Sequence, residues 1–379
     1  MSNCRYISSI ARAEDQLLPH MPFQWWWFTV PMRDGAFISL ELFVRQGTLG
    51  RFLVISYNPR ASTTIIDDLS VKQKSDSVLA YSEGRLVLRL TCDRLVFFFP
   101  EMIGSLRFRS TLAWSVGLAD SLPIRRSHAV PFVWTVPGAQ VKYSGFVLRK
   151  RFVQFATDEL YGYRDRNFGK DYTRSWRWLS TPSLIEIPWS TQYEHENFKS
   201  LWRKCSAQAR GKRPRPETAM VVGGQETDVL NVTRANICLL WLEGKSFSLV
   251  PYELGHHQGF QDFNVEDVDD ELAVSFRAVD SKIEIIAHLR APRESFAMYP
   301  ILDGAGEAVY NDVRQTSSQL LQSCAAHGLV QVRPVGQAPR LFLAPLACIE
   351  VGDRDLPRWY APYVDMNRVA AEANFPVPK

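Results

Sequence analysis

The chain has 379 residues, of which 46% are hydrophobic, 22% charged and 12% aromatic, and its formal net charge is +4. This composition predicts an ordinary soluble globular protein, and the length favours two domains. So small a net charge gives no argument for a partner of nucleic acid or an anionic membrane surface. No run approaches the roughly 20 apolar residues of a membrane span, so we expect no stable membrane insertion.

Six cysteines are scattered along the chain, at positions 4, 92, 205, 238, 324 and 348. No two of them have the close spacing of a zinc or redox motif. The N-terminal segment also lacks the apolar region of a secretory signal. Together these features predict reduced thiols in a cytoplasmic protein.

The segment Gln24-Trp25-Trp26-Trp27-Phe28 is the first unusual feature along the chain. As a strand, it would send Trp25 and Trp27 to one face and Trp26 and Phe28 to the other. Each indole would remove roughly 150–250 Å² from water, so both faces should be buried. The rings either fill a core or domain interface, or line a pocket for an apolar ligand, and the residues alone favour neither.

Strand signals then dominate the chain. Short alternating or apolar runs predict strands at 37–44, 51–57, 85–91, 95–99, 106–112, 140–147, 176–181, 184–187, 237–242, 246–252, 272–278, 282–289 and 341–350. Helical periodicity is confined to 312–327 and 365–373, and the basic, proline-containing segment 203–216 predicts a solvated excursion between strands. The pattern predicts an all-β fold of antiparallel sandwiches or barrels with few short helices. We place the boundary between an N-terminal β-domain, 1–155, and a C-terminal β-barrel domain, 156–379, just before the next unusual segment.

Residues 161–180 read YGYRDRNFGKDYTRSWRWLS and combine charges with large aromatic side chains. Strand alternation puts Tyr163, Asp165 and Asn167 on one face, and Arg164, Arg166 and Phe168 on the other. A carboxyl group facing an aromatic cavity would have its pKa raised by burial and could serve as a general acid. The same carboxyl group paired with Arg166 or Arg174 would be a structural salt bridge, which composition alone favours. Asp171 is the second acid–base candidate.

Several common catalytic motifs do not occur. The sequence holds no dinucleotide-binding glycine pattern in strand–helix context, no Walker motif and no Gly-x-Ser-x-Gly elbow. His256 and His257 form the only histidine cluster, and adjacent strand residues point to opposite faces, so they cannot readily chelate one metal. These observations argue against redox, phosphotransfer and α/β-hydrolase chemistry, and we expect neither a cofactor nor a metal.

Two motifs resemble those of a known family. Trp25-Trp26-Trp27-Phe28 with Asp34-Gly35 is similar to the W-W-Y/F-F signature of the two-domain lipocalin-like proteins, which include carotenoid 1,2-hydratases, AttH-like proteins and fungal Diels–Alderases. The run 163–169 and Trp176-Arg177-Trp178 resemble the family's central G-Y-x-D-x-N-W-G…W-x-W motif, with Phe168 in place of the usual Trp. The resemblance implies two β-rich domains, each a curved sandwich or lipocalin-like barrel, with a ligand cavity near their interface.

The resemblance also implies a reaction. Our leading hypothesis is a cofactor-free cyclase of Diels–Alder or hetero-Diels–Alder type, acting on a hydrophobic polyene, terpenoid or polyketide, with coupled dehydration as an option. The residues expected in catalysis are Asp165, Arg166, Arg174 and Asp171. The residues expected to contact the substrate are Trp25, Trp26, Trp27, Tyr161, Tyr163, Asn167, Phe168, Trp176 and Trp178.

Two alternatives use the same residues. In an alkene hydratase or protonation-triggered cyclase, Asp165 would donate a proton to the substrate and aromatic rings would stabilise the resulting cation. In a non-catalytic lipid or terpenoid carrier, the same side chains would only bind. In every case the expected partner is a hydrophobic small molecule, and the sequence leaves the oligomeric state open.

Overall fold

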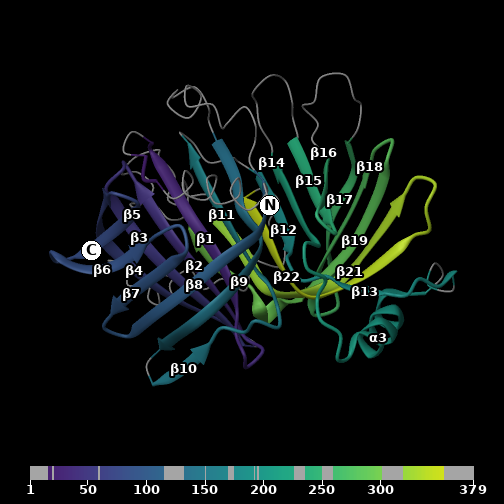
Figure 1. Ribbon diagram of the computed structural model, residues 1–379, viewed down its shortest axis with the longest axis horizontal. Coiled ribbons are helices and arrows are strands. Elements are labelled where there is room, and N and C mark those ends of the chain that lie inside the picture. The colour runs from purple at the N-terminus through teal and green to yellow at the C-terminus, as the bar shows by residue number, and fades with distance from the viewer. Residues whose placement is uncertain are drawn as a thin grey trace.

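The structure is a computed structural model. It describes residues 16–18, 21–58, 60–114, 132–149, 151–169, 175–191, 193, 196–225, 235–249, 259–300 and 319–353. Two antiparallel sheets account for most of these residues and stand side by side along the longest axis of the molecule (Figure 1).

The first sheet closes on itself. Its strand order is β10-β9-β11-β1-β2-β3-β4-β5-β6-β7-β8, and β8 pairs with β9, which gives a closed ten-strand barrel with β10 attached to β9. The strands are β1 (Phe23–Pro31), β2 (Phe37–Arg45), β3 (Leu49–Asn58), β4 (Arg60–Lys74), β5 (Ser77–Ser82), β6 (Arg85–Leu90), β7 (Arg94–Phe99), β8 (Met102–Trp114), β9 (Phe132–Arg149), β10 (Phe152–Phe155) and β11 (Gly162–Gly169).

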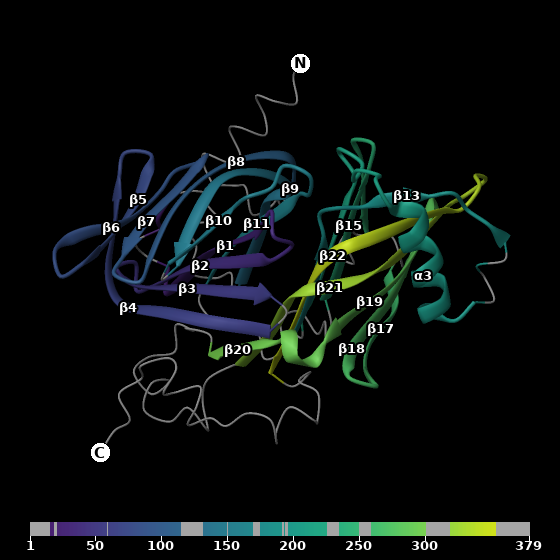
Figure 2. The same ribbon diagram turned by 90° about the horizontal axis from the view of Figure 1, so that it is seen from below.

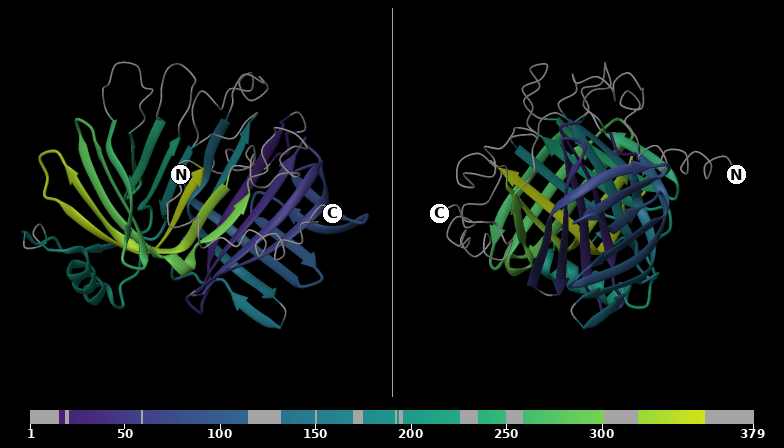
Figure 3. Two further views of the ribbon diagram at one scale, coloured as in Figure 1. Left: turned by 180° about the vertical axis from the view of Figure 1, so that it is seen from behind. Right: turned by 90° about the vertical axis from the view of Figure 1, so that its left-hand side faces the viewer.

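The second sheet curls without closing among the described residues. Its order is β16-β15-β14-β12-β22-β21-β19-β18-β17, with β13 paired to β22 and β20 to β21. The strands are β12 (Ser175–Thr181), β13 (Ile185–Ile187), β14 (Ala219–Gln225), β15 (Ala235–Leu242), β16 (Lys245–Leu249), β17 (Gly259–Val268), β18 (Glu271–Val279), β19 (Ile283–Pro292), β20 (Ala297–Pro300), β21 (Gln319–Pro334) and β22 (Arg340–Asp353). The curl opens away from the barrel (Figure 3).

Helices are few. The α-helix α3 (Phe198–Ala209) packs on the second sheet at the end far from the barrel, and a 3₁₀ turn, η3, covers Arg293–Ser295 (Figure 2). The Asn197 side chain caps α3 by accepting a hydrogen bond from the Ser200 amide at 2.9 Å. No helix in the described part of the chain is both long and apolar enough to cross a membrane.

Four buried clusters lie among the described residues; three follow from strand alternation, and the fourth lies between α3 and the second sheet. The barrel core fills the barrel interior and includes Trp26 and Phe28. A second cluster lies between the two sheets; we call it the seam, and it contains Trp25, Trp27, Tyr163, Trp178 and Cys324 with their neighbours. A third fills the other face of the second sheet. The even and odd residues of β1 therefore enter different cores, as its period-two pattern predicts.

The all-β prediction is confirmed, and the structure has a strand within each predicted strand range. One local prediction is wrong. Residues 319–327 of the predicted helix form part of β21, because a strand buried on both faces, with a bulge between Ser323 and Ala326, mimics helical spacing. The predicted excursion 203–216 does lie between two strands, β13 and β14, and is mostly exposed; its start, 203–209, forms part of α3, whose Cys205 and Ala209 are buried.

Other predictions fall outside the described residues, namely the helix at 365–373, the first part of the helix at 312–327 and the histidine pair at 256–257. The change from the first sheet to the second falls between Gly169 and Ser175, later in the chain than residue 155. The five described cysteines are all free thiols.

Candidate active site in the seam

On the barrel face that borders the seam, one row of side chains runs across the three neighbouring strands β11, β1 and β2. Trp27 of β1 lies opposite Asp165 of β11 on one side and opposite Glu41 of β2 on the other. Directly paired residues of neighbouring strands point to the same face of a sheet. Asp165 and Glu41 are each 2% exposed. The register therefore puts two buried carboxyl groups on either side of one indole.

A second row of paired side chains runs across the strands β12, β22 and β21 of the second sheet. Glu350 of β22 pairs with Trp178 of β12 and with Gln322 of β21. Trp178 meets the barrel row directly, because its ring centroid lies 4.5 Å from that of Trp27 and 5.0 Å from that of Tyr163. The two rows thus interlock through edge-on aromatic contacts.

Asp165 is held by neutral hydrogen-bond donors. Its Oδ2 atom accepts hydrogen bonds from Trp134 Nε1 at 3.0 Å and from the Tyr163 hydroxyl at 3.2 Å, and its Oδ1 atom accepts one from Asn167 Nδ2 at 3.4 Å. Burial raises the pKa of Asp165 well above its ordinary value, Glu350 adds to the rise, and the three hydrogen bonds oppose it without cancelling it. A raised pKa favours the neutral acid, and since Oδ2 already accepts two bonds, Oδ1 is the better position for the proton.

Glycine allows one of these donors to reach Asp165. Trp134, from β9, packs against Gly223 of β14, where a Cβ atom would come within 2.9 Å of the indole. Any larger residue at 223 would displace the ring. The second sheet therefore helps to position a barrel residue that contacts the carboxyl group.

Two further hydrogen-bonded chains lie in the seam, and the second of them joins the two sheets. Trp27 Nε1 donates to Ser39 Oγ, which in turn donates to Glu41 Oε1 at 3.1 Å. Across the seam, the Tyr57 hydroxyl donates to Gln322 Oε1 at 2.8 Å, and Gln322 Nε2 donates to Glu350 Oε2 at 3.0 Å. The seam therefore contains three buried acidic side chains among tryptophans and tyrosines.

Sequence reasoning missed Glu41, Glu350 and Trp134. A signal for the two glutamates is present, because each lies between apolar neighbours of a buried strand: Glu41 between Leu40 and Leu42 in β2, and Glu350 between Ile349 and Val351 in β22. A lone charged residue in a doubly buried strand is costly unless it is satisfied, so it marks a site worth testing. Trp134 carries no such signal.

The predicted alternation of 163–168 is confirmed, and the predicted salt bridge between Asp165 and Arg166 is wrong. Asp165 points into the seam, whereas the Arg166 guanidinium lies over the Trp26 ring at 4.7 Å and the Phe168 ring at 5.2 Å, on the barrel side. Arg164 likewise lies 4.8 Å from the Phe108 ring inside the barrel. Neighbouring residues of one strand cannot reach the same face, so Arg166 cannot pair directly with Asp165.

The other residues predicted for the site lie in different places. Trp25 lies in the seam, with its ring 5.4 Å from Phe43, and Tyr161 is 7% exposed beneath the Lys142 ammonium, which lies 5.5 Å from its ring. Asp171, Arg174 and the side chain of Trp176 lie outside the described residues. Among the described residues, no three His, Cys, Asp or Glu side chains are placed to hold a metal ion.

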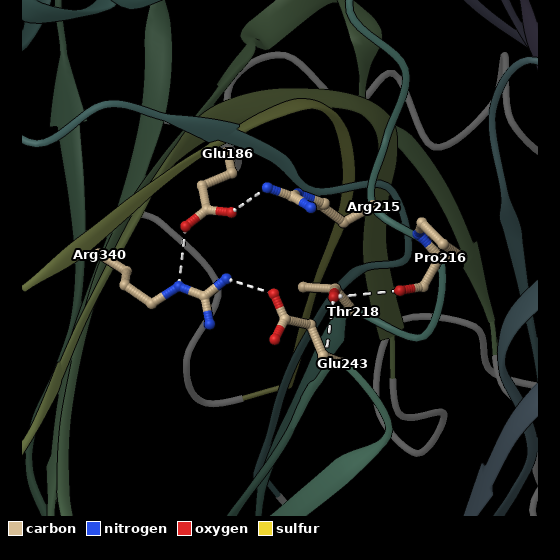
Figure 4. Close-up of polar contacts among 6 residues, drawn as sticks. All are labelled: Glu186, Arg215, Pro216, Thr218, Glu243 and Arg340. Carbon is tan, nitrogen blue, oxygen red and sulfur yellow. Dashed lines mark hydrogen bonds and ion pairs between the residues drawn. The ribbon is translucent and has the colours of Figure 1, made fainter.

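A separate cleft of about 290 Å³ opens on the second sheet and is lined by Glu186, Trp189, Lys212, Arg215 and Arg340 with their neighbours. Its charges satisfy one another, as Figure 4 shows: Glu186 accepts from Arg340 at 2.8 Å and pairs with Arg215 at 2.8 Å, while Arg340 also donates to Glu243 at 2.9 Å. Burial raises the pKa of Glu186, but the two arginines outweigh burial and hold the pKa below its ordinary value. The cleft is therefore a structural ion-pair network.

Comparison with known proteins supports the fold assignment. The chain superposes on CghA crystallised with Sch210972 with a TM-score of 0.53 at 13% identity, covering 89% of this chain and 90% of that one, and on CghA alone with a TM-score of 0.52 at 13% identity, covering 91% of each. Kievitone hydratase from Nectria haematococca matches with a TM-score of 0.43 at 9% identity, over 89% of this chain and 91% of that one. No protein-family model and no curated protein matches the sequence.

The fold is thus a closed barrel joined to a curled half-barrel, with both signature motifs at the seam. This is the fold of the two-domain lipocalin-like proteins that the sequence motifs resemble. CghA, at 13% identity, is the solved structure on which this statement rests.

Proposed function

We propose that the protein is a cofactor-independent cyclase of Diels–Alder or hetero-Diels–Alder type, acting on a hydrophobic polyene, terpenoid or polyketide intermediate. The observation that carries the proposal is the Asp165 carboxyl group, buried in an aromatic seam and held by Trp134, Tyr163 and Asn167. Burial raises the pKa of this group and so favours its neutral form, which can donate a hydrogen bond to a substrate carbonyl.

The chemistry needs two contributions from the chain. Rings such as Trp27, Tyr163 and Trp178 offer rigid walls that hold two reacting π-systems in a near-attack geometry, an advantage of up to roughly 7–11 kcal/mol. The Asp165 acid, donating from Oδ1, would stabilise negative charge developing on the dienophile carbonyl. Neither contribution requires an electron carrier.

A second candidate is an alkene hydratase or protonation-triggered cyclase. It is favoured by the same raised pKa of Asp165, since a neutral carboxylic acid can transfer its proton to an alkene. Trp27 and Trp178 would then stabilise a carbocation through their π-faces.

One substitution separates the candidates. Asp165→Asn keeps a hydrogen-bond donor at nearly the same position but cannot transfer a proton. Turnover of an accepted substrate should fall only partly in a cycloaddition catalyst and be nearly abolished in a proton donor. A carrier would bind the substrate, as measured by tryptophan fluorescence, and show no turnover in either form.

Solvent isotope provides an independent measurement. Reaction in D₂O places deuterium on a carbon atom when an alkene is protonated, and a pure cycloaddition leaves the product unlabelled. Full activity of Asp165→Asn, with no deuterium incorporated, would remove Asp165 from either mechanism.

A further inference from the structure

The outer face of the barrel carries two mainly apolar, partly exposed rows on the strands β7 to β10. The register aligns Phe98, Ile103, Leu148 and Val153 in one row, and Val96, Ser105, Phe146 and Phe155 in the next. Phe98 is 57% exposed, Val153 49% and Phe155 50%. Alternate residues of the same strands, such as Phe97 and Val147, already fill the barrel core. The outer rows are therefore not needed to build the barrel.

A basic band borders these rows along the same strands. Arg94 lies opposite Arg107, and Arg109 lies opposite Lys142. Like charges in directly opposed positions destabilise a sheet unless a counter-ion is present. None of these four side chains forms an ion pair with a described residue; Arg94 donates to Ser105 Oγ at 3.1 Å. We call the apolar rows and the basic band together the outer face.

Charge is strongly asymmetric over this part of the fold. The five strands β6 to β10 contain seven Lys or Arg residues and no Asp or Glu. The whole chain carries only +4, so the remaining residues carry a net negative charge. The outer face is thus apolar at one end and cationic beside it, on the side of the barrel where β7, β8, β9 and β10 run side by side (Figure 1).

We infer that the outer face docks the protein on a lipid bilayer that contains anionic headgroups. The apolar rows, with Phe98 and Phe155 most prominent, would enter the boundary between headgroups and acyl chains, and the basic band would contact lipid phosphates. A second copy of this chain is a poorer occupant, because the same five strands of that copy offer no acidic residue to the band. Contiguous exposed apolar surface rimmed by charge is typical of such interaction sites.

Docking of this kind is peripheral and reversible, and it goes beyond the proposed chemistry. The seam is formed by β1, β2, β3 and β11, and by β8 and β9 near Leu112 and Trp134, with the second sheet. The apolar rows lie toward the other ends of β8 and β9, at Ile103 and Leu148. A docked protein would keep its seam clear of the bilayer. Vesicle binding can be measured without any substrate, so failure of this inference is distinct from failure of the proposed reaction.

The test is co-sedimentation of the full chain with vesicles of phosphatidylcholine, with and without phosphatidylserine. We expect binding to the anionic vesicles that weakens as salt is added, and little binding to the neutral ones. The double variant Arg94→Ser, Arg107→Ser should weaken binding about fivefold for each lost charge. Phe98→Ser with Val153→Ser keeps every charge and should weaken binding at least about tenfold.

The matched control removes two exposed lysines from the second sheet, Lys245→Ser and Lys282→Ser, and should leave vesicle binding unchanged. Circular dichroism and thermal melting check that each variant is folded. We expect each to fold, because the substituted side chains lie on the surface and not in a core. Absence of binding to anionic vesicles at low salt, or equal loss in the control, would overturn the inference. So would sedimentation showing a dimer that Phe98→Ser dissociates, since a second copy would then be the occupant.

Discussion

The ring of Trp178 packs edge-on against the ring of Trp27, with centroids 4.5 Å apart and planes inclined by 76°. These residues come from the two sequence motifs and from two different sheets. Their contact brings the Asp165–Trp27–Glu41 row of the barrel against the Trp178–Glu350–Gln322 row of the second sheet. Four predictions test this arrangement and its neighbours.

The first prediction concerns this aromatic contact. Trp27→Leu and Trp178→Leu should each destabilise the protein, and a double-mutant cycle should show a coupling of about 0.5–1.5 kcal/mol. Chemical denaturation measures the free energies of unfolding. Trp26 is the matched control, because it precedes Trp27 but points into the barrel core. A cycle of Trp26→Leu with Trp178→Leu should show no coupling, and equal coupling in both cycles would contradict the contact.

The second prediction concerns the pH dependence of stability. Burial raises the pKa of Asp165 in the folded state above its unfolded value. The stability that this group contributes is therefore present below the unfolded pKa and is lost as pH rises through the folded pKa. Asp165→Asn removes that loss, so the variant should gain melting temperature relative to wild type as pH rises. Exposed Asp158→Asn should not, and the same trend in both variants would contradict a neutral Asp165.

The third prediction concerns the Tyr163 hydroxyl. It donates to Asp165 Oδ2 at 3.2 Å, which lowers the pKa of that carboxyl group. Tyr163→Phe should therefore raise the pKa of Asp165 further, as measured by the infrared band of the protonated carboxyl during a pH titration. Tyr143→Phe also deletes a buried hydroxyl, but that hydroxyl donates to the Tyr163 carbonyl at 2.9 Å, and it should leave the titration unchanged. An unaltered or lowered pKa in Tyr163→Phe would rule out the hydrogen bond.

The fourth prediction concerns the ion-pair network of the second sheet. Arg340 and Arg215 hold the pKa of Glu186 below its ordinary value. A depressed pKa contributes stability above the unfolded pKa, and that contribution is lost as pH falls through the folded pKa. Glu186→Gln should be less stable than wild type near neutrality, and the difference should vanish in acid. A difference that stays constant from neutral to acid pH would show that the charge of Glu186 is irrelevant.

Period-two alternation carried much of the prediction from sequence. It separated Trp25 and Trp27 from Trp26, and Asp165 from Arg166, because consecutive strand residues point to opposite faces whatever the rest of the fold does. The segment 319–327 shows the limit of the method. A strand that is buried on both faces and interrupted by a bulge loses its alternation, and its apolar residues then fit helical spacing equally well.

Local alternation does not predict which residues of different strands contact one another, because those contacts depend on register and on sheet order. The sequence by itself determined an all-β chain, with tryptophans and one aspartate concentrated in two short motifs, since composition and local period are properties of neighbouring residues. Only the tertiary structure decided that Asp165 faces Trp134 and not an arginine, that Glu41 lies in the same row of the barrel, and that Glu350 lies on the other side of the seam. It also gathered seven basic residues on five adjoining strands, which a net charge averaged over the whole chain conceals.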